Sequence, residues 1–275
     1  DKAGAGDLIM DPNNPRILYA STWEMKRNGY RMDSGGPDSR MFKSTDGGDH
    51  WTDVSEAPGL PGFPWGIVGI AVSPMDSNRV WAIIEAADGG VFRSEDGGKT
   101  WKKINENRAL RQRAWYYSRI YADPQNADKV YVMNVSYGVS TDGGKTWKKG
   151  LFVSDRTGVS DVEFLPTNPN VLFAAAWKAE RKPWTIISGG TPEEGGIYKS
   201  LDGGSSWTKI EKGLPDALIG KIDIEVSPSD SRIVYALVEA PGKEGGLYKS
   251  TDQGESFEQV SSHDGIRTRP FYYTN

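Results

Sequence analysis

Hydrophobic and polar residues alternate along most of the chain in short runs. Runs such as "IGKIDIEV" (219–226) and "VSDVEF" (159–164) place apolar residues at every second position, the period of a strand with one buried face. Clusters of Pro, Asn, Asp, Ser and Gly separate these runs, and no segment between them shows the period of an amphipathic helix. The pattern therefore predicts an all-β chain of short antiparallel strands.

One phrase occurs five times along the chain. The copies are "KSTDGGDHW" (43–51), "RSEDGGKTW" (93–101), "VSTDGGKTW" (139–147), "KSLDGGSSW" (199–207) and "KSTDQGESF" (249–257). Each follows a hairpin phrase such as "SPSDSRIVYA" (227–236), so one unit holds about four strands. The Asp residues recur at steps of 50, 46, 60 and 50, and four-stranded units of this size build a β-propeller. We expect each phrase to join the third strand of a blade to the fourth.

The Asp in each phrase is explained by the turn itself. Its carboxylate can accept hydrogen bonds from backbone amides of its own turn, and the Gly residues supply positive φ. The aromatic residue at the end opens the outer strand and can cover the turn with its ring. We therefore interpret five Asp residues as structural: Asp46, Asp96, Asp142, Asp202 and Asp252.

The consensus S-x-D-x-G-x-[ST]-[WF] resembles the Asp-box, or BNR repeat, of sialidases, xyloglucanases and sortilin-type propellers. His50 and Gln253 are its clear departures, and the repeats cover essentially the whole chain. The chain is most similar to bacterial sortilin-like BNR-repeat proteins described as glycosyl hydrolase-like. This resemblance implies an exported propeller that acts as a peptide-binding, protein-binding or scaffold module. The alternative that it implies is a glycoside hydrolase of xyloglucanase or sialidase type.

The units also repeat at longer range. Asp202 follows Asp46, and Asp252 follows Asp96, by 156 residues (202 − 46 and 252 − 96), and "RQRAWYYSR" (111–119) returns as "RTRPFYYTN" (267–275). We predict one propeller region over 1–275, with three blades at 1–154 and two blades plus the start of a sixth at 155–275. The sixth Asp would fall near 298 (142 + 156), so we expect a covalent continuation or a partner chain to complete the propeller.

Composition excludes several classes of partner. The net charge is -4 and the pI about 5.4, which leaves no basic face for nucleic acid. No run approaches the roughly 20 apolar residues of a membrane span. The chain has no Cys and two His residues, and "DGG" lacks the phosphate-loop pattern, so we predict no metal and no cofactor. With the resemblance, this favours an extracellular or periplasmic location.

Four segments depart from the blade pattern and are candidates for binding. Two are insertions, "EMKRNGYRMDSGG" (24–36) and "KAERKPWTIISGG" (178–190), which we expect to form long loops. The other two are the related phrases "RQRAWYY" and "RTRPFYY". All four combine basic and aromatic residues. Such residues suit a peptide, protein or carbohydrate ligand. The candidate binding residues are Arg27, Tyr30, Arg113, Trp115, Arg181, Trp184, Arg269 and Phe271. The alternative to ligand binding is structural packing for the insertions. For the "YY" phrases, the alternative is that they form an inner strand in the core.

Two further features remain open at this point. The stretch "LPGFPWG" (60–66) adds Phe63 and Trp65 in an expected loop. Glycoside hydrolysis would need two carboxylates about 5 to 9.5 Å apart in one cleft, and residue spacing selects no such pair. Asp7 and Asp161 occupy equivalent inner-strand positions and are the candidates for facing a channel. The catalytic residues, if there are any, stay unassigned.

Overall fold

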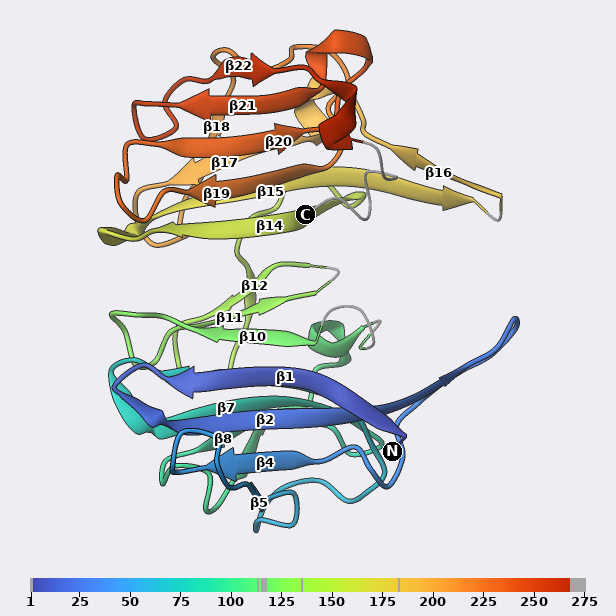
Figure 1. Ribbon diagram of the computed structural model, residues 1–275, viewed down its shortest axis with the longest axis vertical. Helices are drawn as coiled ribbons and strands as arrows, with labels where there is room; N and C mark the ends of the chain where they lie inside the picture. The colour runs from blue at the N-terminus through green and yellow to red at the C-terminus, as the bar shows by residue number, and fades with distance from the viewer. Residues whose placement is uncertain (1, 113, 115–117, 135, 183, 268–275) are drawn as a thin grey trace. The chain divides into compact units, whose positions relative to one another are not determined.

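The strands form five separate antiparallel sheets in a computed structural model of the chain (Figure 1). The structure describes all residues except 1, 113, 115–117, 135, 183 and 268–275. Each sheet takes four consecutive strands in chain order, and two sheets carry one additional short strand. The predicted all-β fold of four-stranded antiparallel blades is confirmed. The predicted start of a sixth blade at 268–275 lies outside the described residues.

The chain divides into two compact units, Asp1–Lys149 and Gly150–Asn275. The first unit contains three sheets. The first sheet consists of β1 (Ala3–Asp11), β2 (Asn14–Arg27), β4 (Met41–Ser44) and β5 (Thr52–Asp53), with β3 (Met32–Ser34) paired to the end of β2. The second consists of β6 (Trp65–Ser73), β7 (Asp76–Ala86), β8 (Gly90–Ser94) and β9 (Lys102–Asn105). The third consists of β10 (Arg119–Ala122), β11 (Val130–Met133), β12 (Gly138–Ser140) and β13 (Lys148–Lys149).

The second unit contains two sheets. The fourth sheet consists of β14 (Thr157–Leu165), β15 (Asn168–Lys182), β17 (Gly196–Ser200) and β18 (Thr208–Ile210), with β16 (Thr185–Ser188) paired to the end of β15. The fifth consists of β19 (Ile222–Val226), β20 (Val234–Val238), β21 (Gly246–Ser250) and β22 (Glu258–Ser261). Four short 3₁₀ helices connect strands in the described chain: η1 (Arg108–Arg111), η2 (Pro192–Glu194), η3 (Gly242–Glu244) and η4 (Asp264–Arg267).

Apolar packing between neighbouring sheets forms the core of each unit. In β7 the run Val80–Ile84 is buried on both faces, as expected for a strand between two other sheets. In β20 buried and half-buried residues alternate, because one face packs on the fourth sheet and the other does not. The central strands therefore read as continuous apolar runs, and the fifth sheet shows the two-residue period of a strand with one covered face.

Candidate functional site

The five repeated turns share one hydrogen-bond network, which Asp96 illustrates. Its carboxylate accepts the amides of Lys99 and Thr100 at 3.0 and 2.8 Å and the Thr100 hydroxyl at 2.6 Å. The Ser94 hydroxyl donates to the same carboxylate at 2.7 Å and accepts the amide of Gly98 at 2.8 Å. The indole of Trp101 donates to the Gly98 carbonyl at 3.1 Å and lies over the turn. Every polar contact of this Asp side chain therefore lies within its own turn.

In the other four turns, too, the carboxylate accepts the amide of the residue four positions on: this holds for Asp46, Asp142, Asp202 and Asp252. The two sequence departures keep the geometry. His50 Nδ1 lies 2.7 Å from the Asp46 carboxylate in place of a hydroxyl, and Gln253 adopts a φ of 60° where the other turns have Gly. Hydrogen bonds from the hydroxyl and amide of Thr100 lower the pKa of Asp96 to about 2. These carboxylates thus stay ionised and engaged with the backbone.

The two insertions form β-ribbons, not the long loops that the sequence suggested. In the first ribbon, β2 continues past the sheet to Arg27 and pairs with β3, and the Asn28 side chain accepts the amides of Tyr30 and Arg31 at 3.1 and 2.8 Å. In the second, β15 continues to Lys182 and pairs with β16. We call residues 24–34 the first arm and residues 178–188 the second arm. Each extends beyond the sheets of its own unit (Figure 1).

A partly buried network anchors the base of the first arm to the second sheet. The indole of Trp23 donates to the Ser34 hydroxyl at 3.0 Å, and this hydroxyl donates to the Glu85 carboxylate at 2.6 Å. The same carboxylate oxygen accepts the amide of Ile67 at 3.0 Å. A Cβ on Gly66 would lie 1.9 Å from that oxygen, so Gly provides the space that the carboxylate occupies. The carboxylate therefore connects the end of β3 to the start of β6.

The second arm repeats this network at equivalent positions. The indole of Trp177 donates to the Ser188 hydroxyl at 2.9 Å, and the hydroxyl donates to the Glu239 carboxylate at 2.5 Å. The amide of Lys221 donates to the same carboxylate oxygen at 2.8 Å. The sequence indicated both insertions but not these anchors. Each anchoring residue recurs after 154 positions (177 − 23, 188 − 34 and 239 − 85), which is a signal that would have found them.

The tips of the arms carry aromatic side chains that contact little else. Tyr30 is 97% exposed and Trp184 is 82% exposed, the two most exposed large hydrophobic residues in the described chain. Arg27 is also exposed at the end of β2, and Arg31 pairs with Asp33 at 2.5 Å. Arg181 lies in β15, but its side chain is outside the description. The first arm therefore carries Arg27 and Tyr30 as exposed residues near its tip, and Trp184 occupies the corresponding position of the second arm.

Other predicted binding residues lie elsewhere or outside the described chain. Arg113, Trp115, Arg269 and Phe271 fall among the residues that the structure does not describe. Trp65 was wrongly expected in a loop: it begins β6, is fully buried and donates from its indole to the Pro61 carbonyl at 3.0 Å. Phe63 stacks on this indole with ring centroids 4.9 Å apart. The segment 60–66 thus closes the core of the first unit.

Asp7 and Asp161 join neighbouring inner strands. The Asp7 carboxylate accepts the amide of Ile70 at 2.9 Å and pairs with Arg119 at 2.7 Å. The Asp161 carboxylate accepts the amide of Ile224 at 2.7 Å. Each Asp sits beside a register shift in its strand, which allows the side chain to reach the adjacent sheet. Both residues therefore fasten one sheet to the next within their unit.

The second unit adds carboxylates near Asp161. Burial raises the pKa of Asp161 to about 6, against the opposing effect of the Ile224 amide. Burial and the charge of Asp161 raise the pKa of Glu163 to about 7, and burial also raises the pKa of Asp223. In the first unit Ile9 and Gly69 occupy the positions of Glu163 and Asp223 (163 − 154 and 223 − 154). This acidic group is thus specific to the second unit.

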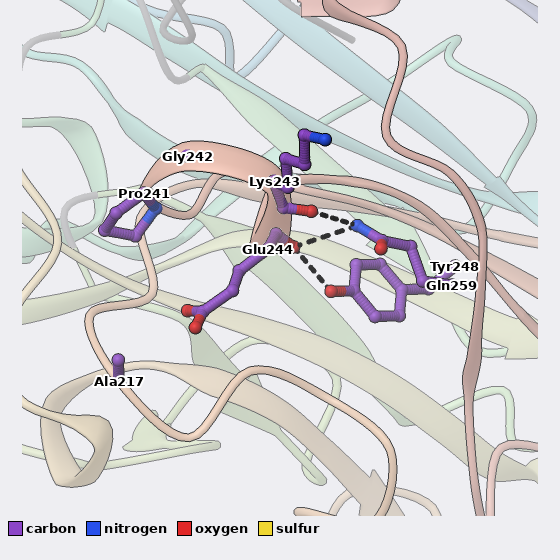
Figure 2. A pocket seen from close by; sticks show the side chains of 7 residues that line it. All are labelled: Ala217, Pro241, Gly242, Lys243, Glu244, Tyr248 and Gln259. Carbon is purple, nitrogen blue, oxygen red and sulfur yellow. Dashed lines mark hydrogen bonds between the residues drawn. The ribbon is translucent and has the colours of Figure 1, made fainter.

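An open depression of about 630 Å³ lies beside η3 on the fifth sheet (Figure 2). The Gln259 amide donates to the Lys243 carbonyl at 2.7 Å, and the Tyr248 hydroxyl donates to the Glu244 carbonyl at 2.5 Å. These polar groups therefore hold η3 in place.

Among the described residues, no group of three or more His, Asp or Glu side chains is arranged to bind a metal ion. No helix in the same residues has the length and apolar character of a membrane span.

The comparisons with known proteins agree with this architecture. Residues 89–188 match the family model described as sortilin, neurotensin receptor 3 (Sortilin-Vps10). The GH74 xyloglucanase from Xanthomonas campestris superposes with a TM-score of 0.63 at 17% identity, over 94% of this chain and 38% of that one. The GH74 enzyme of Niastella koreensis superposes with a TM-score of 0.57 at 20% identity, over 93% of this chain and 38% of that one. The search of curated proteins finds no match.

These likenesses define the class of protein. The chain is a β-propeller of the BNR type, and the resemblance inferred from its repeated turns is confirmed. It spans about two fifths of the length of the two GH74 structures, since it covers 38% of each. At this level of identity the likeness establishes the fold, and the activity has to be argued from the residues.

Proposed function

We propose that this chain is part of an exported propeller whose arms each bind a peptide or protein segment. The observation that carries the proposal is the exposure of Tyr30 and Trp184, 97% and 82%, at the tips of two anchored ribbons. Large aromatic side chains supply contact area with few rotatable bonds, and they are enriched at the energetic centres of interfaces. Export is supported by the likeness to the sortilin family.

The anchoring networks favour binding because they fix the arms in advance. At the base of each arm an indole donates to a Ser hydroxyl, and this hydroxyl donates to a Glu carboxylate. Little conformational freedom therefore remains to be lost at the base when a ligand binds. Met25–Arg27 of β2 pair only with β3 among the described strands. This leaves a strand edge to which an extended peptide can add by main-chain hydrogen bonds.

The charge of the arms favours an acidic or polar segment. Residues 24–34 contain three Lys or Arg and two Asp or Glu, and residues 178–188 contain three and one. Both arms are therefore net positive in a chain whose net charge is -4. Basic side chains beside an exposed ring attract acidic residues of a ligand and increase the rate of encounter.

The test is selection of ligands from a displayed library of random peptides. We expect the wild-type protein to retain a family of related sequences enriched in Asp and Glu. The Tyr30→Ala/Trp184→Ala variant should lose this binding at unchanged thermal stability, because neither ring is buried. Leu201→Ala is the matched control, since Leu201 is 68% exposed and lies outside both arms. Equal retention of the selected peptides by the wild-type protein and the arm variant would refute the proposal.

Glycoside hydrolysis is the second candidate, and the acidic group of the second unit is the observation in its favour. A carboxyl with the raised pKa of Glu163 can act as a general acid near neutral pH. Glycoside hydrolysis ranks second because the carboxylate of Asp161, which lies near Glu163 in β14, already accepts the Ile224 amide. Turnover of a xyloglucan or sialoside substrate that is abolished by Glu163→Gln would reverse this order.

A further inference from the structure

Residues 28–31 form the turn at the tip of the first arm, the ribbon that extends from the first sheet (Figure 1). The turn contains Asn28 and Gly29, the only Asn-Gly pair of the sequence. Both residues are exposed, and a Cβ at Gly29 would have no other group within 4 Å. Gly also has no side chain of its own to hinder its backbone nitrogen. The turn therefore places an exposed carboxamide beside an accessible backbone amide.

The contacts of the Asn28 side chain favour attack on its carbonyl carbon. The Oδ1 atom accepts the backbone amides of Tyr30 and Arg31, at 3.1 and 2.8 Å. Two N–H donors on one carbonyl oxygen stabilise the negative charge that develops on it when a nucleophile adds to the carbon. The Nδ2 amino group donates no hydrogen bond within the part of the chain that the structure describes. The Asn28 carboxamide is thus polarised, and its leaving group faces solvent.

The backbone nitrogen of Gly29 is the adjacent nucleophile, and its N–H group donates to no described residue. The sequence also contains six Asp-Gly pairs, and in each of them the glycine amide is hydrogen-bonded at 2.7 to 3.0 Å. These amides belong to Gly47, Gly89, Gly97, Gly143, Gly203 and Gly265. A bonded amide has to give up its acceptor before it can attack. The fold therefore restrains every such pair in the described chain except the one at the arm tip.

We propose that Asn28 is a site of spontaneous deamidation. The Gly29 nitrogen loses its proton to solvent and adds to the Cγ atom of Asn28. The Cγ–Nδ2 bond then breaks, the departing nitrogen takes up a proton from solvent, and ammonia and a five-membered succinimide result. Water opens this ring at one of its two carbonyls and leaves aspartate or isoaspartate at position 28. The overall reaction consumes one water and releases one ammonia, without oxidation or reduction.

The reaction changes the charge of the first arm. Residues 24–34 contain three Lys or Arg and two Asp or Glu, so their net charge of +1 (3 − 2) falls to zero with a new carboxylate. The second arm has Lys182, Pro183 and Trp184 at the corresponding place and no Asn, so it keeps its charge. Fewer acidic segments should then bind to the first arm alone. This consequence rests on the proposed function, whereas the reaction itself does not.

Peptide mass mapping of the folded protein tests the reaction. The wild-type protein is held at mildly alkaline pH, and samples are digested after Lys, which releases residues 27–43 as one peptide with Asn28 as its single Asn. We expect this peptide to gain about 1 Da, the difference between a hydroxyl and an amino group. The gain should be at least about tenfold faster than in peptides that contain other Asn residues.

Asn28→Ser is the control variant, and its peptide 27–43 should keep its mass. A wild-type peptide that keeps its mass while the protein stays folded would overturn the proposal. Equal rates of mass gain at Asn28 and at the other Asn residues would overturn it as well.

The effect on binding is measured in the Trp184→Ala background, where the second arm lacks its exposed ring. We expect aged protein, and fresh protein with Asn28→Asp, to bind the selected acidic peptides about twofold to fivefold more weakly than fresh protein. Unchanged affinity after complete deamidation would overturn the effect on the first arm. If fresh wild-type protein binds no peptide while the mass gain occurs, the proposed function fails and the deamidation site stands.

Discussion

Replacement of Asp96 by Ala measures what one repeated turn contributes to stability. The Asp96 carboxylate accepts two amides and two hydroxyls, all within its turn. One hydrogen bond to a charged group contributes about 1.5 to 3 kcal/mol net, and the freed amides can partly rehydrate because they lie near solvent. The lowered pKa of Asp96, about 2 against an ordinary 3.8, corresponds to roughly 2 kcal/mol before solvent screening, which reduces it. We therefore expect Asp96→Ala to cost about 1 to 2 kcal/mol at pH 7.

The pH dependence of this loss follows from the direction of the pKa shift. Folding lowers the pKa, so the stabilisation is fully present above the unfolded value near 4 and is lost as the pH falls through about 2. The free energy of unfolding can be measured by urea unfolding followed by tryptophan fluorescence. The difference between wild type and Asp96→Ala should be constant from pH 7 to 5 and should decrease below pH 4. Asp49→Ala is the matched control, since Asp49 accepts no turn amide, and should change stability by less than about 0.5 kcal/mol. An unchanged unfolding midpoint together with lost ligand binding would refute the structural role of Asp96.

Three further changes test separate parts of the account. Folding raises the pKa of Glu163 to about 7, so the free energy of unfolding of the wild type should decline as the pH rises from 4.5 to 7. Glu163→Gln should remove this decline and raise the free energy of unfolding at pH 8 by about 1 to 2 kcal/mol. A variant with the same pH profile as the wild type would contradict this expectation. Gln253→Gly should stabilise the fifth turn by about 0.5 to 1 kcal/mol in the same assay, because φ at this position is 60°, and a loss of stability would show that the Gln side chain matters. Gly220→Ala would place a Cβ 2.0 Å from the Glu239 carboxylate and should speed tryptic cleavage after Arg181, whereas Gly62→Ala, with open space around it, should not. Equal cleavage rates would contradict the anchoring role of Glu239.

The repeated turns were predictable because their chemistry is local. Asp96 and its four donors lie within seven residues of sequence, 94 to 100, so the phrase itself specifies the hydrogen bonds. Alternation of apolar residues then specified the strands on either side. The fold class followed from the number and spacing of these units.

The arms were only partly predictable because their anchors are distant in sequence. Length and composition marked the insertions, but Ser34 and Glu85 lie 51 residues apart, as do Ser188 and Glu239. No local pattern relates a hydroxyl to a carboxylate at that distance. Trp65 was misplaced for a similar reason: Pro and Gly beside it suggested a loop, whereas its burial depends on packing between the first two sheets.

The most direct test of the central claim is to locate a bound ligand on the arms. A photoreactive benzoylphenylalanine is introduced in place of Tyr30, of Trp184 or of Leu201, and each protein is irradiated with a peptide from the library selection. Cross-links from positions 30 and 184, with none from position 201, would establish the arms as the binding surface. Cross-linking from position 201 with none from the arm tips would contradict the account.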